Sequence, residues 1–195
     1  MHCRSRLAGD CALTDTSCVN ATPHSCIPRT SLSLLYFQQE DKGLSTLPHA
    51  KNLRNGRYSQ SGQIYLLTAV TQHRAPVFAD WCVGRLVVHE FRHAQIEGLA
   101  DSLAWVVMPD HFHWLIELKQ STLPALMLAT KSRSARAVNA RMGRSGRFWQ
   151  KGFHDRAIRR EEDLATVARY IVANPLRAGL VTRVHDYPLW DAIWI

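Results

Sequence analysis

The stretch Met108-Pro-Asp-His-Phe-His-Trp-Leu-Ile-Glu-Leu118 joins a turn signal to an apolar run of strand length. Side chains alternate between the faces of a strand, so His111 and His113 leave one face, about 6.6 Å apart along the backbone. Neutral imidazoles are common metal ligands, and two on one face can share an ion. The alternative is two ordinary histidines at a sheet edge. We expect the opposite face to lie on the core with Phe112, Trp114, Ile116 and Leu118.

Apolar periodicity predicts strands and helices on both sides of this stretch, with Asp80 as a helix N-cap and Gly98 as a helix stop. The predicted elements are strands at 63–71, 103–108, 111–119 and 148–158, and helices at 80–97, 122–141 and 161–173. Their order is β-α-β-β-α-β-α, with a tight turn at Pro109-Asp110. This order predicts an α+β fold of the ferredoxin-like class, an antiparallel sheet with helices packed on it.

The first 50 residues differ in composition from the rest of the chain. They are rich in Ser, Thr, Cys and Pro, and they show no sustained hydrophobic period. We therefore expect a poorly ordered extension at 1–50 and a single functional domain at 51–195. Neither a membrane-length apolar run nor the charge pattern of a signal peptide is seen, so we expect a cytoplasmic protein.

The positive charge is concentrated in the second part of the chain. The formal net charge is +8, yet residues 1–50 hold four basic and four acidic residues, so the excess lies in 51–195. Within 119–160, eleven Lys or Arg accompany one acid, Asp155. This density on a folded domain predicts a polyanionic partner, with nucleic acid as the first candidate. A solvated charged face is the alternative.

Between Phe148 and Arg156, aromatic and basic residues alternate. Such a pattern suits unpaired nucleic acid, because cations follow phosphates and aromatic rings offer stacking faces. The alternative is that Phe148, Trp149 and Phe153 belong to the core. The residues that we expect to bind nucleic acid are Arg54, Arg57, Lys131, Arg133, Arg136, Arg141, Arg144, Arg147, Trp149, Lys151, His154 and Arg156.

The last predicted helix has one aromatic residue outside its apolar stripe. Tyr170 lies on the polar face, Asn174 follows one turn later, and Pro175 disfavours helical geometry at Asn174. A tyrosine in this position is usually just an exposed side chain, so the helix alone does not assign it a role. The core stripe has the spacing i, i+3, i+4, i+7 and i+8, and it consists of Leu164, Val167, Ala168, Ile171 and Val172.

Three motifs together resemble a known family. The stretch from Met108 resembles the His-hydrophobic-His motif of single-strand DNA endonucleases that use one catalytic tyrosine. Ala168-Arg-Tyr-Ile-Val-Ala-Asn-Pro-Leu-Arg-Ala-Gly-Leu180 is similar to the tyrosine helix of the IS200-like transposases, and Phe148–Arg156 to their intervening strand. The branch that the chain resembles most is the REP-associated tyrosine transposases, over residues 52–190.

This resemblance implies a metal-dependent DNA transposase that acts on single-stranded DNA with hairpin-forming palindromic repeats. His111 and His113 match the metal ligands, Tyr170 the nucleophile, and Asn174 a further ligand that is often Gln in relatives. Such a mixed site suits Mg²⁺ or Mn²⁺. The ion would orient the phosphate, and the tyrosine would form a 5′-phosphotyrosine with release of a 3′-OH. Because the family contains dimers, monomer and homodimer both stay open.

Two other classes of function remain compatible with the sequence. The chain could be a catalytically silent DNA- or RNA-binding protein that keeps the fold and the basic surface. It could also hold a structural metal at His111 and His113 while the basic segment binds RNA. The presence of both histidines and Tyr170 favours the enzyme.

Overall fold

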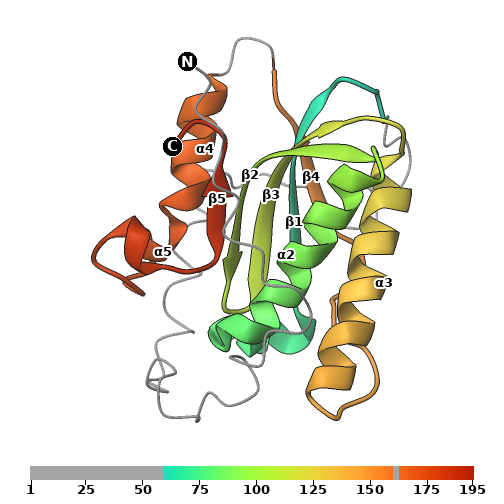
Figure 1. Cartoon of the computed structure of the whole chain (residues 1–195), viewed down its shortest axis with the longest axis vertical. Coiled ribbons are helices and arrows are strands. Elements are labelled where there is room, and N and C mark those ends of the chain that lie inside the picture. Colours follow the sequence, from blue (N-terminus) through green and yellow to red (C-terminus); the bar gives the residue numbers. More distant parts are fainter. Residues whose placement is uncertain (1–58, 160–162) are drawn as a thin grey trace.

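The computed structural model describes residues 59–159 and 163–195. At its centre is a five-stranded antiparallel sheet in the order β4-β1-β3-β2-β5 (Figure 1). The first four strands have the order of a ferredoxin-like sheet, so the predicted α+β fold class is confirmed. Residues 1–50, Arg54 and Arg57 lie outside the described part. The strands are β1 (Ile64–Val70), β2 (Ala100–Met108), β3 (His111–Leu118), β4 (His154–Ala157) and β5 (Trp190–Ala192).

Local sequence signals account for where the helices begin. Asp80 accepts a hydrogen bond from the Cys82 amide (2.9 Å), Thr122 from Ala125 (3.3 Å) and Asp163 from Ala165 (3.0 Å). Each of these caps satisfies an amide that the first helical turn leaves without a partner. The helices are α2 (Trp81–Ile96), α3 (Leu123–Arg141), α4 (Leu164–Val172) and the single turn α5 (Asn174–Arg177).

One face of the sheet packs against α2, with α3 beside that helix (Figure 1). Phe91 of α2 stacks on Trp114 with ring centroids 4.3 Å apart and meets the edge of Phe112 at 5.1 Å. Both β3 side chains are fully buried. The alternation predicted for this strand is therefore correct, and the core lies on the face opposite the two histidines.

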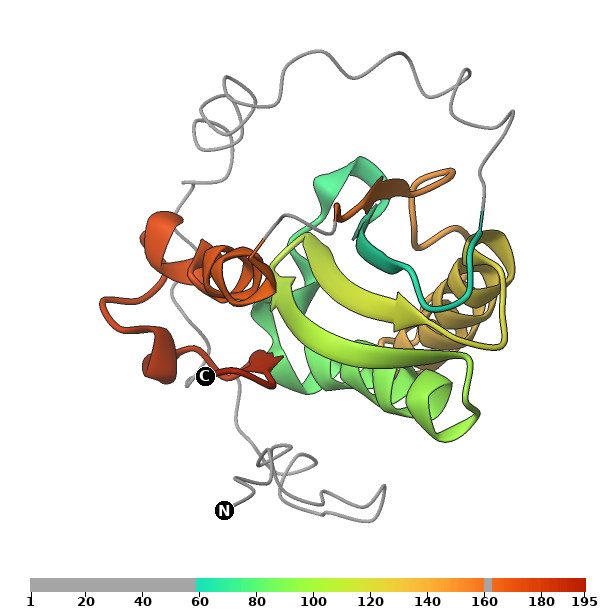
Figure 2. The same ribbon diagram turned by 90° about the horizontal axis from the view of Figure 1, so that it is seen from above.

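The sheet face that carries the histidines, opposite α2, is covered in part by α4. In the strand register, His113 lies between Thr68 of β1 and Val106 of β2. β2 is buried at every position from Ala104 to Met108, so both of its faces are covered there. Since α2 covers the Trp105 face, the remaining cover comes from α4, which packs on β2 (Figure 2).

Two predicted elements differ from the observed ones. The strand predicted at 148–158 is regular only in β4, with an isolated bridge between Thr71 and Trp149. Between them, Gly152 has a φ of 79°, a left-handed conformation that breaks the extended chain. The tail, for which no strand was predicted, supplies β5 at the edge of the sheet. A three-residue strand is too short for a periodic signal.

Candidate active site

The turn between β2 and β3 is fastened to the segment that follows β1. The Asp110 carbonyl accepts hydrogen bonds from the Thr71 amide (2.8 Å) and the Thr71 hydroxyl (3.0 Å). The Pro109 carbonyl accepts from the Phe78 amide (2.9 Å). Because these bonds join segments more than 30 residues apart, they fix the backbone from which His111 projects.

His111 is oriented by the carboxylate of the preceding residue. Its Nδ1 lies 2.6 Å from Asp110 Oδ1, and Arg74 Nη1 donates to Asp110 Oδ2 at 3.2 Å. Burial raises the pKa of Asp110, but the His111 hydrogen bond and the charges of His111 and Arg74 outweigh burial, and the net pKa is lowered. Because the Asp110 carboxylate engages Nδ1 of His111, Nε2 is the ring nitrogen that would face a ligand.

His113 is held from the neighbouring strand. Its Nδ1 lies 2.9 Å from Thr68 Oγ1. Burial lowers the pKa of His113 to about 3, assisted by the charges of His111 and Arg177. The ring is therefore neutral at physiological pH, as a metal ligand must be. The ring centroids of His111 and His113 lie 4.9 Å apart, and their shared metal-ligand role stays a prediction.

A third ligand for an ion at the histidine pair is not supplied by another His, Cys, Asp or Glu of the described residues. Within residues 59–159 and 163–195, no cluster of three His, Cys, Asp or Glu side chains could hold a metal ion. Asn174, the expected third ligand, is 4% exposed. Its Nδ2 donates to the Ile171 carbonyl (2.9 Å), and its Oδ1 accepts from Arg177. An amide oxygen has two lone pairs, so one remains, and the role of Asn174 stays a prediction.

Tyr170 projects from α4 away from the core. It is 59% exposed, whereas Ala168 and Ile171 on the same helix are buried. The predicted separation of Tyr170 from the apolar stripe is thus correct. The Arg177 guanidinium lies 3.9 Å from the centroid of the Tyr170 ring. The positive charge of Arg177 also contributes to the lowered pKa of His113, after burial and the charge of His111.

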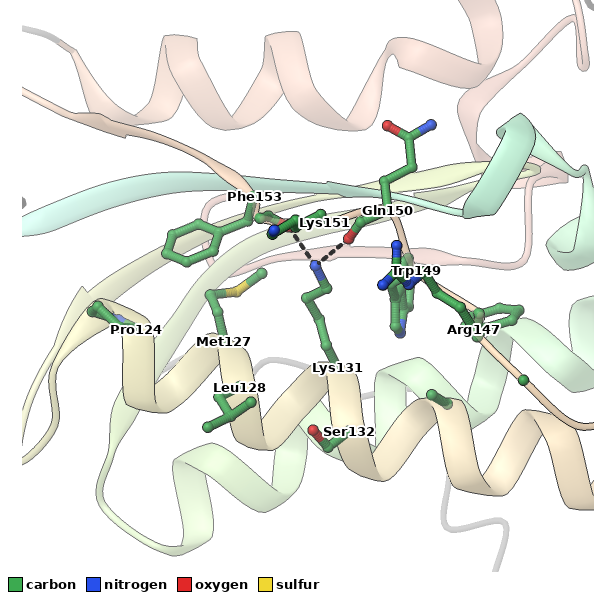
Figure 3. A pocket seen from close by; sticks show the side chains of 14 residues that line it. Pro124, Met127, Leu128, Lys131, Ser132, Arg147, Trp149, Gln150, Lys151 and Phe153 are labelled. Atoms are coloured by element: carbon green, nitrogen blue, oxygen red, sulfur yellow. Dashed lines mark hydrogen bonds between the residues drawn. The ribbon is translucent and has the colours of Figure 1, made fainter. Parts of the chain in front are cut away.

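Two of the predicted nucleic-acid-binding cations already have partners in the protein. Lys131 donates to the backbone carbonyls of Gln150 (2.8 Å) and Gly152, and burial lowers its pKa to about 8. It lines a pocket of about 470 Å³ between α3 and residues 146–153 (Figure 3). Arg133 contacts His93 (2.6 Å) and pairs with Glu97 (3.2 Å) on α2. Neither side chain is a freely exposed cation.

The predicted role of Trp149 in stacking on nucleic-acid bases is wrong. It is 5% exposed and packs against Phe78, Phe112 and Phe148, while its indole N–H donates to Ser134 Oγ (3.1 Å). The ring lies in the core and has no face open to a base. The predicted nucleic-acid-binding residues that are exposed, and whose role stays a prediction, are Arg136, Arg141, Arg144, Arg147, Lys151, His154 and Arg156.

Sequence reasoning missed three residues of this site. Asp110 was assigned only to the turn, although a carboxylate next to a candidate ligand histidine is a signal for an orienting group. Thr68 had no local signal, because its role depends on the pairing of β1 with β3. Arg177 lay within the motif that contains Tyr170 and Asn174, but its contacts depend on how α5 turns back toward α4.

Comparisons with known proteins place this geometry in context. Residues 59–174 match the family model described as "Transposase IS200 like". A relative from Haemophilus influenzae, whose name describes it as a REP-associated tyrosine transposase, is 29% identical over 143 residues, which is 65% of this chain and 78% of that protein. The REP-associated tyrosine transposase of Escherichia coli K12 is 30% identical over 103 residues, half of this chain and 59% of that protein.

A solved structure has a similar fold. It is that of a REP-associated tyrosine transposase bound to a REP hairpin, with a TM-score of 0.58 and 23% identity. The similarity covers 70% of this chain and 81% of that chain. No helix in the described part of this chain is long and apolar enough to cross a membrane.

Proposed function

Because the chain belongs to the IS200-like transposase family, we propose that it is a metal-dependent endonuclease and strand transferase for single-stranded DNA with hairpin-forming palindromic repeats. One observation carries the proposal. Two imidazoles, each with its Nδ1 already engaged, lie on one face of the sheet, and the helix that packs on the neighbouring strand β2 carries an exposed tyrosine under the Arg177 guanidinium. The REP hairpin of the structural relative and the exposed cations of this chain support the substrate class.

The proposed metal ligands and the residues that orient them have separate roles. His111 and His113 would bind the ion through Nε2, with Asp110 and Thr68 holding the rings in place. The chemistry that a bound Mg²⁺ or Mn²⁺ supplies is neutralisation of charge on the scissile phosphate. The neutral state of His113 keeps its lone pair available over the physiological pH range.

Tyr170 performs the transfer. Its Oη forms a bond to phosphorus while the bond between phosphorus and the 3′ oxygen breaks, which yields a 5′-phosphotyrosine and a free 3′-OH. The phenol loses its proton, and the departing 3′ oxygen takes one up. Since one phosphodiester replaces another, a 3′-OH can reverse the step without a nucleotide cofactor. The exposure of Tyr170 lets a DNA strand reach it.

The experiment is a search for the covalent adduct. The full chain is incubated with labelled single-stranded hairpin oligonucleotides and Mn²⁺ or Mg²⁺, and the products are separated on a denaturing gel. We expect a protein–DNA adduct that is absent in Tyr170→Phe. Tyr65→Phe is a matched control, because it removes another phenol hydroxyl but lies in the core on the opposite face.

The outcome separates two classes of function. An adduct that persists in Tyr170→Phe would reject Tyr170 as the nucleophile. Tight hairpin binding without cleavage or adduct would reject the enzyme and favour the catalytically silent nucleic-acid-binding protein. Chelation by EDTA is expected to prevent adduct formation without preventing binding through the basic surface.

A further inference from the structure

Arg177 makes three contacts across the tyrosine helix. Its Nη1 donates to the Tyr170 carbonyl at 2.9 Å, its Nη2 donates to Asn174 Oδ1, and its guanidinium lies over the Tyr170 ring. A planar cation over an aromatic ring is attracted to the π face and also restricts the ring's rotation. An otherwise exposed tyrosine on a short helix thereby has a defined orientation.

The guanidinium has capacity for a further ligand. It carries five N–H donors, and the described residues accept from two of them. Three N–H groups therefore remain beside the Tyr170 ring. Arg177 is only partly buried, so these groups can be reached from solvent. A fork of donors in this position matches the paired oxygens of a phosphate.

We propose that Arg177 is a positioning residue that holds the Tyr170 ring for attack and presents its remaining N–H groups to the phosphate that Tyr170 attacks. This inference rests on the proposed function of Tyr170 as the nucleophile. Arg177 would thus orient the nucleophile and bind the phosphate, whereas the histidine pair would bind the metal ion. In the DNA-bound protein, the guanidinium lies over the face of the Tyr170 ring and beside the phosphate, so the path from the tyrosine oxygen to phosphorus stays open.

A purely structural role is the competing explanation, because Arg177 also caps a carbonyl at the end of α4. Lysine distinguishes the two roles. In Arg177→Lys, the ammonium keeps the charge and can still donate to the carbonyl, but it lacks the planar fork and the flat face. A cap would be rescued by lysine, whereas ring positioning would not.

The first measurement needs no catalytic activity. The full chain is labelled with 3-fluorotyrosine, and the Tyr170 fluorine resonance is assigned as the one lost in Tyr170→Phe. We expect Arg177→Ala and Arg177→Lys to shift this resonance. Arg169→Ala is the control, because Arg169 lies on the same helix but contacts Thr166 and Asp163 instead. An unchanged Tyr170 resonance in Arg177→Ala would overturn the proposal.

The second measurement is single-turnover adduct formation with a hairpin oligonucleotide and Mn²⁺. We expect Arg177→Ala to slow the step about 100-fold, as a misplaced reacting group does, while the DNA concentration at half-maximal rate changes less than the rate does. Arg177→Lys should remain slow. A wild-type rate in Arg177→Lys would overturn the proposal. If the wild-type chain forms no adduct, the proposed function fails, and the fluorine spectra still test ring positioning by Arg177.

Discussion

On one face of the sheet, His111 and His113 each engage Nδ1 with a neighbouring side chain, and Nε2 has no hydrogen-bond partner among the described residues. On the other face, Lys131 gives its ammonium to two backbone carbonyls, and Arg133 pairs with Glu97. Both sets of side chains are polar, and each is at least partly buried. The first set is held through one ring nitrogen each, whereas the second set joins α3 to its neighbours.

This difference shows that a polar side chain can be held in one orientation and either keep or lose its capacity for a further hydrogen bond or ligand. A ligand must be held rigidly and must still have an unused donor or acceptor. Asp110 and Thr68 achieve this for the histidines because an imidazole has two nitrogen atoms. The Lys131 ammonium is partly removed from water and directed at the backbone, so a basic residue in the sequence need not be an exposed cation in the fold.

The largest effect is expected from Phe112→Ala, which removes support from beneath the histidine pair. Phe112 is fully buried against Phe91 and Trp149, so the free energy of unfolding should fall by about 3–5 kcal/mol. Urea unfolding measures the change. Leu128→Ala is the control, since Leu128 on α3 is 70% exposed. Equal losses in the two variants would contradict the placement of the core.

A smaller effect should follow from Asp110→Asn, which keeps the shape of the side chain but removes the charge beside His111. Loss of an orienting carboxylate typically weakens metal binding about 10–100-fold. Titration calorimetry of the DNA-free protein with Mn²⁺ measures this affinity. Asp101→Asn is the matched control, because Asp101 pairs with Lys119 at the far end of the hairpin. An unchanged affinity in Asp110→Asn would remove Asp110 from the site.

The smallest effect is expected from the pH dependence of stability due to Lys131. Burial lowers its pKa to about 8 from an ordinary value of 10.5. Between these values, the unfolded chain binds more protons than the folded protein, so the contribution of Lys131 to the free energy of unfolding rises with pH. Calorimetric melting at intervals from pH 7 to pH 10 measures this rise.

Two variants isolate the contribution of Lys131. Lys131→Met should remove its part of the rise, while Lys151→Met, at an exposed position in the neighbouring loop, should retain it. Identical pH profiles for the wild-type chain and Lys131→Met would show that Lys131 titrates as an ordinary surface lysine. Lys131 would then not be held by its backbone contacts, and the contrast between the two sheet faces would be smaller than these contacts indicate.

Much of the site could be predicted because its signals are local. Strand alternation placed His111 and His113 on one face, and the helical period placed Tyr170 outside the apolar stripe. Trp149 could not be assigned from its basic neighbours, since the same alternation of aromatic and basic residues fits a stacking surface and a core edge. Its burial depends on Phe78 and Phe112, which lie far away in the sequence.

The sequence by itself determined the alternation of strands and helices, the shared face of the two histidines and the exposure of Tyr170, because these follow from periods of two and 3.6 residues. Tertiary structure decided the partners of His113 and Tyr170. Strand register brings Thr68 to His113, and the turn after α4 brings Arg177 to Tyr170. Such contacts depend on packing between segments, which no local pattern specifies.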